Sequence, residues 1–196
     1  MTRSSEEMYF STPFLREKVR QAPDVLYAEP RWYACHTRAR AEKKVAERLE
    51  AAGVEPYVPL LERERQWADR VKRVRFPLFP GYVFARFDLT RLGAVVRTPG
   101  VSQVLRPSGY PTPVSEEELA AVRRLVAGAN ETGLLPTPVD YLEPGQQVVV
   151  VSGPFQGMRG VLVEARGASR VVVRVSAIRQ AVSVEMDRRL LRPAAA

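Results

Sequence analysis

Residues 75–88, with the sequence RFPLFPGYVFARFD, constrain the fold more than any other segment. Pro77, Pro80 and Gly81 exclude a regular central strand at its start, because proline donates no ladder hydrogen bond and glycine permits a tight bend. Residues 82–88 are rich in aromatic and branched side chains and predict a strand. The segment is therefore either a loop that enters a core strand or an aromatic surface that receives a partner.

The residues before this segment predict a strand, a helix and a hairpin arm. Residues 32–37 predict a short strand. Val45 and Leu49 then recur at helical spacing, and Gly53 stands where a C′ glycine would end the helix. Residues 62–75 alternate Glu with Arg and then become basic, which predicts a long hairpin. The outer helix face is expected to carry Glu42, Lys43, Lys44, Glu47, Arg48 and Glu50.

The residues after it predict a short helix over 89–97, a strand over 101–106 and a second helix. That helix is expected to begin with a capping box of Ser115 and Glu118 and to end at Gly128. The resulting β-α-β-β-α-β order, with an added terminal helix, is typical of an α+β fold of the split βαβ (ferredoxin-like) kind with an antiparallel sheet.

The C-terminal third has a different character. Residues 129–142 contain two prolines, a glycine and no basic residue, which predicts a linker. Short strands with Gly-rich turns follow and predict a small five-stranded β-barrel. The expected organisation is a tail at 1–30, an α+β domain at 31–128, a linker at 129–142 and a barrel at 143–193.

The charge favours a polyanionic partner. Thirty Lys and Arg residues stand against 22 Asp and Glu, which leaves a net charge of +8 and a pI of about 10. Residues 31–128 hold eighteen basic and eleven acidic residues, so the basic character lies in that domain. Nucleic acid is the simplest partner for such a surface.

The residue types argue against an enzyme. Cys35 is the one cysteine, so no internal disulfide forms, and a reducing, cytoplasmic location is expected. His36 adjoins it, but neighbours on a strand point to opposite faces. No metal cluster, P-loop or Gly-x-Ser-x-Gly motif is present, and no apolar run is long enough for a membrane span. We expect a monomer without catalysis, metal or cofactor.

Two motifs carry a family resemblance that runs from Arg31 to Pro193. The Arg31-Trp-Tyr opening of the first strand and Phe79-Pro-Gly-Tyr-Val resemble the N-terminal (NGN) domain of NusG-family transcription elongation factors. Ser152-Gly-Pro-Phe-Gln-Gly-Met-Arg-Gly resembles the KOW motif of an SH3-like barrel. Both motifs occur in the family's order, with a linker between them.

The segment 66–72 followed by 77–84 resembles the specialised UpxY and RfaH paralogues, which suppress pausing or termination on selected operons. Housekeeping NusG more often has a Phe-Phe-Pro-Gly-Tyr form. The resemblance therefore favours an operon-selective antitermination factor. The alternatives are a housekeeping NusG that couples polymerase to Rho or the ribosome and, in another class, a ribosomal or RNA-binding KOW protein.

The resemblance also implies contact residues. The NGN domain is expected to bind the clamp helices of RNA polymerase through an apolar pocket and to reach the gate loop near Arg91. Non-template or upstream DNA is a second expected partner, and a small-subunit ribosomal protein or Rho is a third. Plain core packing is the alternative for Trp32, and a solvated helix face is the alternative for Arg48. The polymerase-binding set is Trp32, Phe79, Tyr82, Phe84 and Arg91; the nucleic-acid-binding set is Arg38, Arg48, Arg70, Lys72 and Arg73; the KOW partner-binding set is Phe155, Ile178 and Arg179.

Overall fold

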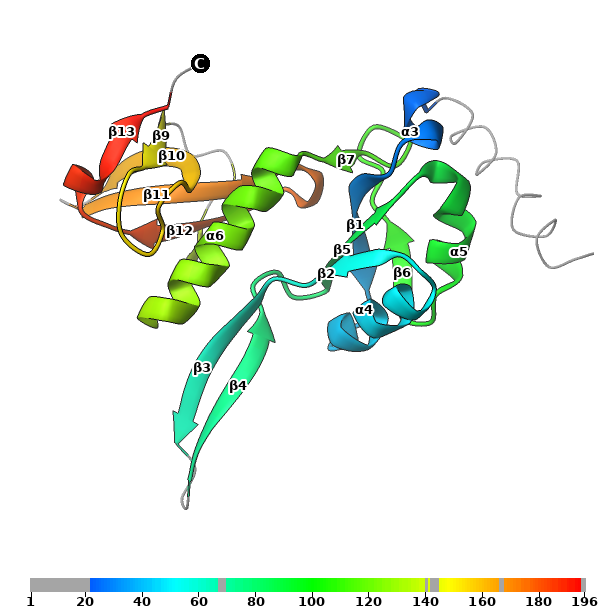
Figure 1. The fold of residues 1–196 in the computed structure, drawn as a ribbon, viewed down its shortest axis with the longest axis horizontal. Helices are drawn as coiled ribbons and strands as arrows, with labels where there is room; N and C mark the ends of the chain where they lie inside the picture. Colours follow the sequence, from blue (N-terminus) through cyan, green and yellow to red (C-terminus); the bar gives the residue numbers. More distant parts are fainter. Residues whose placement is uncertain (1–21, 67–69, 140, 142–144, 166–167, 195–196) are drawn as a thin grey trace, which may run out of the picture. The chain divides into compact units, whose positions relative to one another are not determined.

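The computed structural model describes residues 22–66, 70–139, 141, 145–165 and 168–194 (Figure 1). The chain forms two compact units. The first comprises residues up to 58 together with 80–114, and the second comprises 59–79 together with 115 onward. Within the described ranges, no helix has the length and apolar character needed to cross a membrane, and no three His, Cys, Asp or Glu side chains gather as metal ligands would.

The first unit is built on a five-stranded antiparallel sheet. Its path is β2-β5-β1-β6, and β7 also pairs with β1. The strands predicted at 32–37, 82–88 and 101–106 are confirmed as β1, β5 and β6. The five strands are β1 (Arg31–Thr37), β2 (Glu55–Tyr57), β5 (Tyr82–Phe87), β6 (Val101–Val104) and β7 (Pro113–Val114).

Short helices complete this unit. Gly53 follows the second of them with φ +72°, as the sequence predicts for a C′ glycine. Residues 1–21 of the tail predicted at 1–30 lie outside the described residues; within the rest of it, Leu26 of the first helix is buried in the core of the unit. The helices are α3 (Val25–Ala28), α4 (Glu42–Ala51), η1 (Leu89–Arg91) and α5 (Leu92–Arg97).

The second unit contains the hairpin, a long helix and a barrel-like sheet. The predicted hairpin is confirmed as β3 (Leu60–Gln66) paired with β4 (Val71–Pro77). The helix, α6 (Glu116–Thr132), begins at Ser115, where both halves of the predicted capping box are present.

The prediction that this helix ends at Gly128 is wrong. The helix continues to Thr132 and ends at Gly133, which has a left-handed φ of +74°. Gly128 instead lies where α6 meets the ring of Phe155, and a Cβ atom at Gly128 would stand 2.5 Å from the ring's Cδ1. The glycine is thus explained by close packing between a helix and an aromatic ring rather than by a helix terminus.

The C-terminal sheet has six antiparallel strands rather than five, in the order β13-β9-β10-β11-β12-β8. The additional strand, β8, falls within the predicted linker and pairs with β12. The strands are β8 (Thr137–Val139), β9 (Gln146–Val150), β10 (Arg159–Ala165), β11 (Ala168–Val175), β12 (Gln180–Glu185) and β13 (Leu191–Pro193), with short 3-10 turns η2 (Ser176–Ile178) and η3 (Arg188–Leu190). The domain boundaries predicted from the sequence stay a prediction.

Candidate functional site

Alternation along β1 and β5 gives the sheet of the first unit two faces. Tyr33 and Cys35 lie on the face that builds the core, where both are buried. The register places Ala34 opposite Phe84 and His36 opposite Tyr82 on the other face. We call this second face the aromatic face; its aromatic or imidazole residues are Trp32, His36, Tyr57, Tyr82 and Phe84.

The aromatic face has a buried part and an accessible part. Trp32 and Phe84 are buried, and the Phe84 ring stacks on Tyr57 with centroids 6.2 Å apart. Tyr82 is half-buried and meets His36 edge to face, with ring centroids 5.3 Å apart. Of the aromatic residues predicted for this sheet, Tyr82 alone is therefore partly accessible.

Phe79, the fourth predicted aromatic, is buried and belongs to the second unit. His36 and Tyr57 were not predicted as part of the surface. The period-two spacing from Trp32 to His36 was a usable signal for the histidine. Nothing local in the sequence marked Tyr57, because only the pairing of β2 with β5 brings it beside Phe84.

A buried carboxylate anchors the turn before Tyr82. The Gly81 N–H donates to Glu42 Oε1 at 2.7 Å, and the Gly81 carbonyl accepts from the Thr37 N–H at 2.8 Å. The prediction that Glu42 lies on the charged outer face of its helix is wrong, since Glu42 is buried. A carboxylate on a backbone N–H is a charge-assisted bond, so α4 and β1 together orient the start of β5.

The structure brings Arg38 and Arg48 to the same turn. The Arg38 N–H donates to the Gly100 carbonyl at 2.9 Å, and Arg48 Nη1 donates to the Pro99 carbonyl at 2.6 Å. Both side chains are exposed, so they flank one surface of the first unit. Part of the Arg48 guanidinium is committed to holding the turn in place.

Arg91 has a structural partner. Its Nη1 and Nη2 atoms donate to the carbonyls of Gly53 and Ala52, each at 2.7 Å. These carbonyls belong to the C-cap residue of α4, Ala52, and to the residue that follows it. Arg91 thus holds the turn that follows α4, and its polymerase contact stays a prediction.

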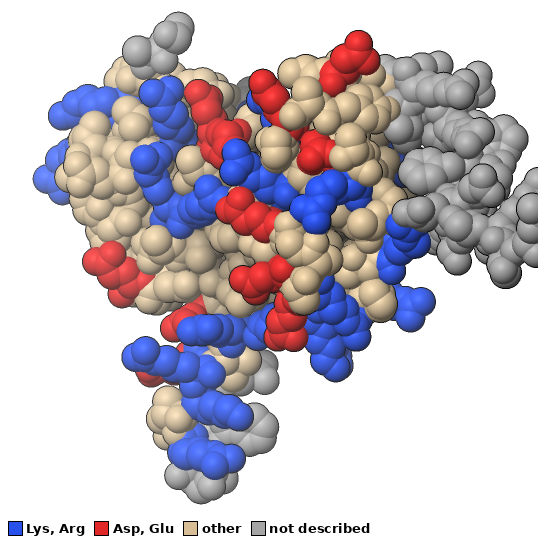
Figure 2. Space-filling model, turned by 45° about the vertical axis from the view of Figure 1, so that its right-hand side comes forward, with Lys and Arg blue, Asp and Glu red and all other residues tan. Residues whose placement is uncertain are grey.

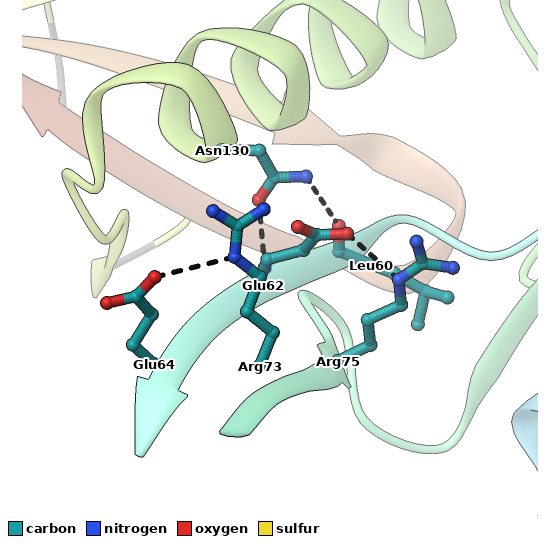
Figure 3. Close-up of polar contacts among 6 residues, drawn as sticks. All are labelled: Leu60, Glu62, Glu64, Arg73, Arg75 and Asn130. Atoms are coloured by element: carbon teal, nitrogen blue, oxygen red, sulfur yellow. Dashed lines mark hydrogen bonds and ion pairs between the residues drawn. The ribbon is translucent and has the colours of Figure 1, made fainter. Parts of the chain in front are cut away.

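The hairpin is the second candidate surface, and basic side chains gather along it (Figure 2). Two cross-strand ion pairs stand on one face: Arg75 Nε lies 2.9 Å from Glu62 Oε1, and Arg73 Nε lies 3.4 Å from Glu64 Oε1 (Figure 3). Exposed pairs of this kind contribute about 0.2–1 kcal/mol each. Their main consequence is that this face carries no net charge among its described residues. Arg70 and Lys72 are exposed.

Asn130 of α6 holds the root of the hairpin. Its Oδ1 accepts from the Glu62 N–H at 2.8 Å, and its Nδ2 donates to the Leu60 carbonyl at 3.1 Å (Figure 3). The carboxamide thereby pairs with the free edge of β3 as a neighbouring strand would. The sequence offered no local signal for this contact, which joins residues 68 and 70 positions apart.

Comparisons with known proteins agree on one family. The family model described as "Transcription termination factor nusG" matches residues 30–123. The Pseudomonas aeruginosa "Transcription termination/antitermination protein NusG" is 30% identical over 170 residues, which cover 80% of this chain and 94% of that protein. The Deinococcus radiodurans protein of the same name is 32% identical over 181 residues, covering 80% of this chain and 95% of its own length. The chain belongs to the NusG family.

A solved structure described as "Domain interaction in Thermotoga maritima NusG" is also similar to this NusG-family chain. It is 26% identical and has a TM-score of 0.46, with 85% of this chain and 98% of that chain covered. The mixed α and β architecture with antiparallel sheets agrees with the predicted fold class, with an NGN domain followed by a β-rich, KOW-like region.

In this NusG-family protein, the predicted KOW contact residues differ in accessibility. Phe155 is buried against Gly128 of α6, and Ile178 is also buried. Arg179 is exposed and has a left-handed φ of +51°. Phe155 and Ile178 therefore present little surface to a partner, and α6 contributes to the burial of Phe155.

Two polar contacts reinforce the packing of α6 on the barrel sheet. Arg124 Nη1 donates to the Gly157 carbonyl at 2.7 Å. Glu118 Oε1 accepts from the Ser176 N–H at 3.0 Å and from the Ser176 hydroxyl at 2.6 Å, while its Oε2 accepts from the Ser115 N–H. Glu118 thus serves the helix cap and the barrel contact at once.

The buried titratable groups of the first unit favour packing over chemistry. Burial raises the pKa of the Cys35 thiol to about 12, so the thiol stays protonated near neutral pH. Burial also raises the pKa of the Tyr33 hydroxyl to about 12. Neither group is an activated nucleophile.

Proposed function

We propose that this protein is a transcription elongation and antitermination factor that binds RNA polymerase through the aromatic face and suppresses pausing or termination. The observation that carries the proposal is the partly accessible Tyr82 on an aromatic sheet face, next to a turn anchored by Glu42. A rigid aromatic held at a fixed angle is a common anchor of protein interfaces, because it buries a large area at low cost in side-chain entropy.

The test of polymerase binding is a Kd measurement with purified RNA polymerase. Tyr82→Ala is expected to weaken binding by about 2 kcal/mol or more, roughly 30-fold in Kd, as for a central interface aromatic. The matched control is Tyr110→Ala, because Tyr110 is also half-buried but packs against the core cluster instead. Equal Kd values for the wild type and Tyr82→Ala would remove the aromatic face from the interface.

Phe79, Trp32 and Phe84 are less suitable for this test, because all three are buried. Truncating a buried aromatic side chain costs about 3–5 kcal/mol of stability, so lost binding would also reflect unfolding. Trp32 and Phe84 lie on the aromatic face itself and are proposed to support Tyr82 through the packing of that face. Arg91 is also a poor test residue for a gate-loop contact, since its guanidinium binds the carbonyls of Ala52 and Gly53 and its removal would also disturb that turn.

DNA is proposed as a second partner, contacted through Arg38 and the hairpin. Support comes from the exposed Arg38 side chain beside the 98–100 turn and from the basic hairpin. Arg38→Ala is expected to weaken recruitment to a transcription complex and to flatten its salt dependence. Arg48→Ala is a weaker test, because it also removes the bond to the Pro99 carbonyl.

We further propose that the factor is operon-selective. Leu78 in the Pro77-Leu-Phe-Pro-Gly81 segment, and Ile178-Arg179-Gln180 in the barrel, support this over the housekeeping form. Nascent-transcript sequencing after depletion distinguishes the two. Loss of downstream reads in one or a few long operons is expected, whereas a change across most transcription units would identify a housekeeping factor.

A further inference from the structure

The hairpin has two chemically different faces, which the strand register defines. Residues directly opposite each other share a face, and the partners are Glu62 with Arg75, Glu64 with Arg73, and Arg63 with Val74. Because side chains alternate along a strand, Arg63 and Lys72 point away from the face that holds the two ion pairs. We call the face with the two ion pairs the paired face (Glu62, Glu64, Arg73, Arg75) and the opposite face the basic face (Leu61, Arg63, Lys72, Val74, Phe76).

The paired face is a poor site for an anion. Releasing Arg73 to an approaching phosphate would leave the Glu64 carboxylate beside that phosphate, and the same holds for Arg75 and Glu62. Like charges at short range oppose binding. The two arginines on this face are therefore balanced by acids that belong to the same strand pair.

The basic face has the opposite character. Arg63 and Lys72 are both exposed, and in the described part of the chain neither forms an ion pair. Lys72 lies two residues from Val74, the partner of Arg63, so the two cations are diagonal neighbours, with Cα atoms about 7–8 Å apart. Leu61 is buried and Phe76 is half-buried at the root of this face, which leaves its cationic part projecting.

The hairpin is held firmly enough to present that face. Asn130 pairs with both the Glu62 N–H and the Leu60 carbonyl, which ties the root of β3 to α6. A two-stranded ribbon with a fixed root can present its cations to a regular array of phosphates, such as the backbone of a duplex.

We propose that the basic face, through Arg63 and Lys72, binds the phosphate backbone of duplex DNA, and that the paired face does not. The inference rests on the proposed function, because it assigns one face of the hairpin to the DNA of a transcription complex. Duplex is favoured over single strands because sites for single strands add exposed aromatic platforms, and the described aromatic on this face, Phe76, is half-buried at the root. The assignment adds Arg63 to the sequence-predicted set and removes Arg73.

The experiment compares two double variants of the full chain that remove the same charge from the same hairpin. They are Arg63→Ala with Lys72→Ala, and Arg73→Ala with Arg75→Ala. Binding to a fluorescein-labelled duplex of mixed sequence is measured by anisotropy over a series of salt concentrations. Each phosphate contact contributes about 0.9 to the slope of log K against log salt, so the basic-face variant is expected to lose about 1.8. The paired-face variant is expected to lose less than half of that.

Equal losses in the two variants, or an unchanged slope in the basic-face variant, would overturn the inference. Tighter binding of single-stranded DNA or RNA than of duplex, with the same loss on mutation, would overturn the choice of duplex. Charge-conserving Arg63→Lys with Lys72→Arg is expected to bind like the wild type, and failure to do so contradicts a backbone contact based on charge.

Polymerase binding separates this inference from the proposed function. The basic-face variant is expected to bind RNA polymerase without DNA as tightly as the wild type does. If it does so while the duplex slope stays unchanged, the face assignment fails and the proposed function stands. If the wild type itself does not bind polymerase, the proposed function fails whatever the duplex data show.

Discussion

The contact between Gly128 and Phe155 leads us to predict that Gly128→Ala does not stabilise the protein, although alanine normally stabilises a helix relative to glycine. Replacing a glycine by alanine inside a helix normally stabilises it by about 0.8–1.0 kcal/mol. Gly128 lies inside a 17-residue helix, so propensity alone predicts that gain. The added methyl group, however, would stand 2.5, 2.7 and 2.9 Å from the Cδ1, Cε1 and Cγ atoms of Phe155.

The steric cost can be set against the gain. Carbon atoms in favourable contact are about 3.5–4.0 Å apart, so the ring must move by roughly 1 Å. Overpacking of this kind costs about 1–3 kcal/mol. Gly128→Ala is therefore expected to be neutral to destabilising, by up to about 2 kcal/mol. Once the ring is removed by Phe155→Ala, the same substitution is expected to stabilise by about 1 kcal/mol.

The coupling free energy between Gly128→Ala and Phe155→Ala is measured by urea unfolding of the wild type, the two single variants and the double variant. It is expected to be about 1–3 kcal/mol. The control is Ala127→Gly at the adjacent, exposed position. It is expected to cost about 1 kcal/mol in both backgrounds, because nothing but helix propensity changes. A Gly128→Ala protein that is more stable than the wild type by the full propensity gain would refute the packing argument.

Three further predictions concern single residues. Arg40 has φ +59°, so Arg40→Gly is expected to raise the melting temperature by relieving about 1 kcal/mol of backbone strain, and a lower melting temperature would contradict it. Asn130→Ala is expected to speed hydrogen exchange at the Glu62 amide by up to about tenfold, whereas Asn130→Asp keeps the acceptor and is expected to have a smaller effect. Burial raises the pKa of the Cys35 thiol from 9.0 to about 12, so above pH 9 the unfolded chain loses this proton first and stability falls until about pH 12. The native thiol is expected to resist alkylation at mildly alkaline pH, and labelling as fast as in denaturant would show that it is accessible.

Local patterns were sufficient for the elements whose signals lie within a few residues. The capping box of Ser115 and Glu118 predicted where α6 begins, because both hydrogen bonds join residues three apart. Gly53 predicted the end of α4 for the same local reason. The alternation of Glu and Arg before residue 75 predicted a hairpin, since period two is a property of the strand itself.

The errors occurred where distant residues decide the outcome. Gly128 resembles a helix end in sequence, but a ring from the barrel occupies the space beside it. Glu42 resembles a solvated helix residue, but its carboxylate is buried on the Gly81 amide. β8 was assigned to a linker because its three residues carry no strand pattern until β12 pairs with them.

The sequence by itself determined the family, the order of the elements and the basic character of the hairpin, because motifs, periodicity and charge are all local properties. Only the tertiary structure decided which aromatic residues stay accessible and which hairpin arginines are balanced by acids. Tyr82 differs from Phe84 in exposure, and Arg63 differs from Arg73 in its neighbours, although each pair reads alike in the chain. The physical reason is that burial and ion pairing depend on strand register, which joins residues that are far apart in sequence.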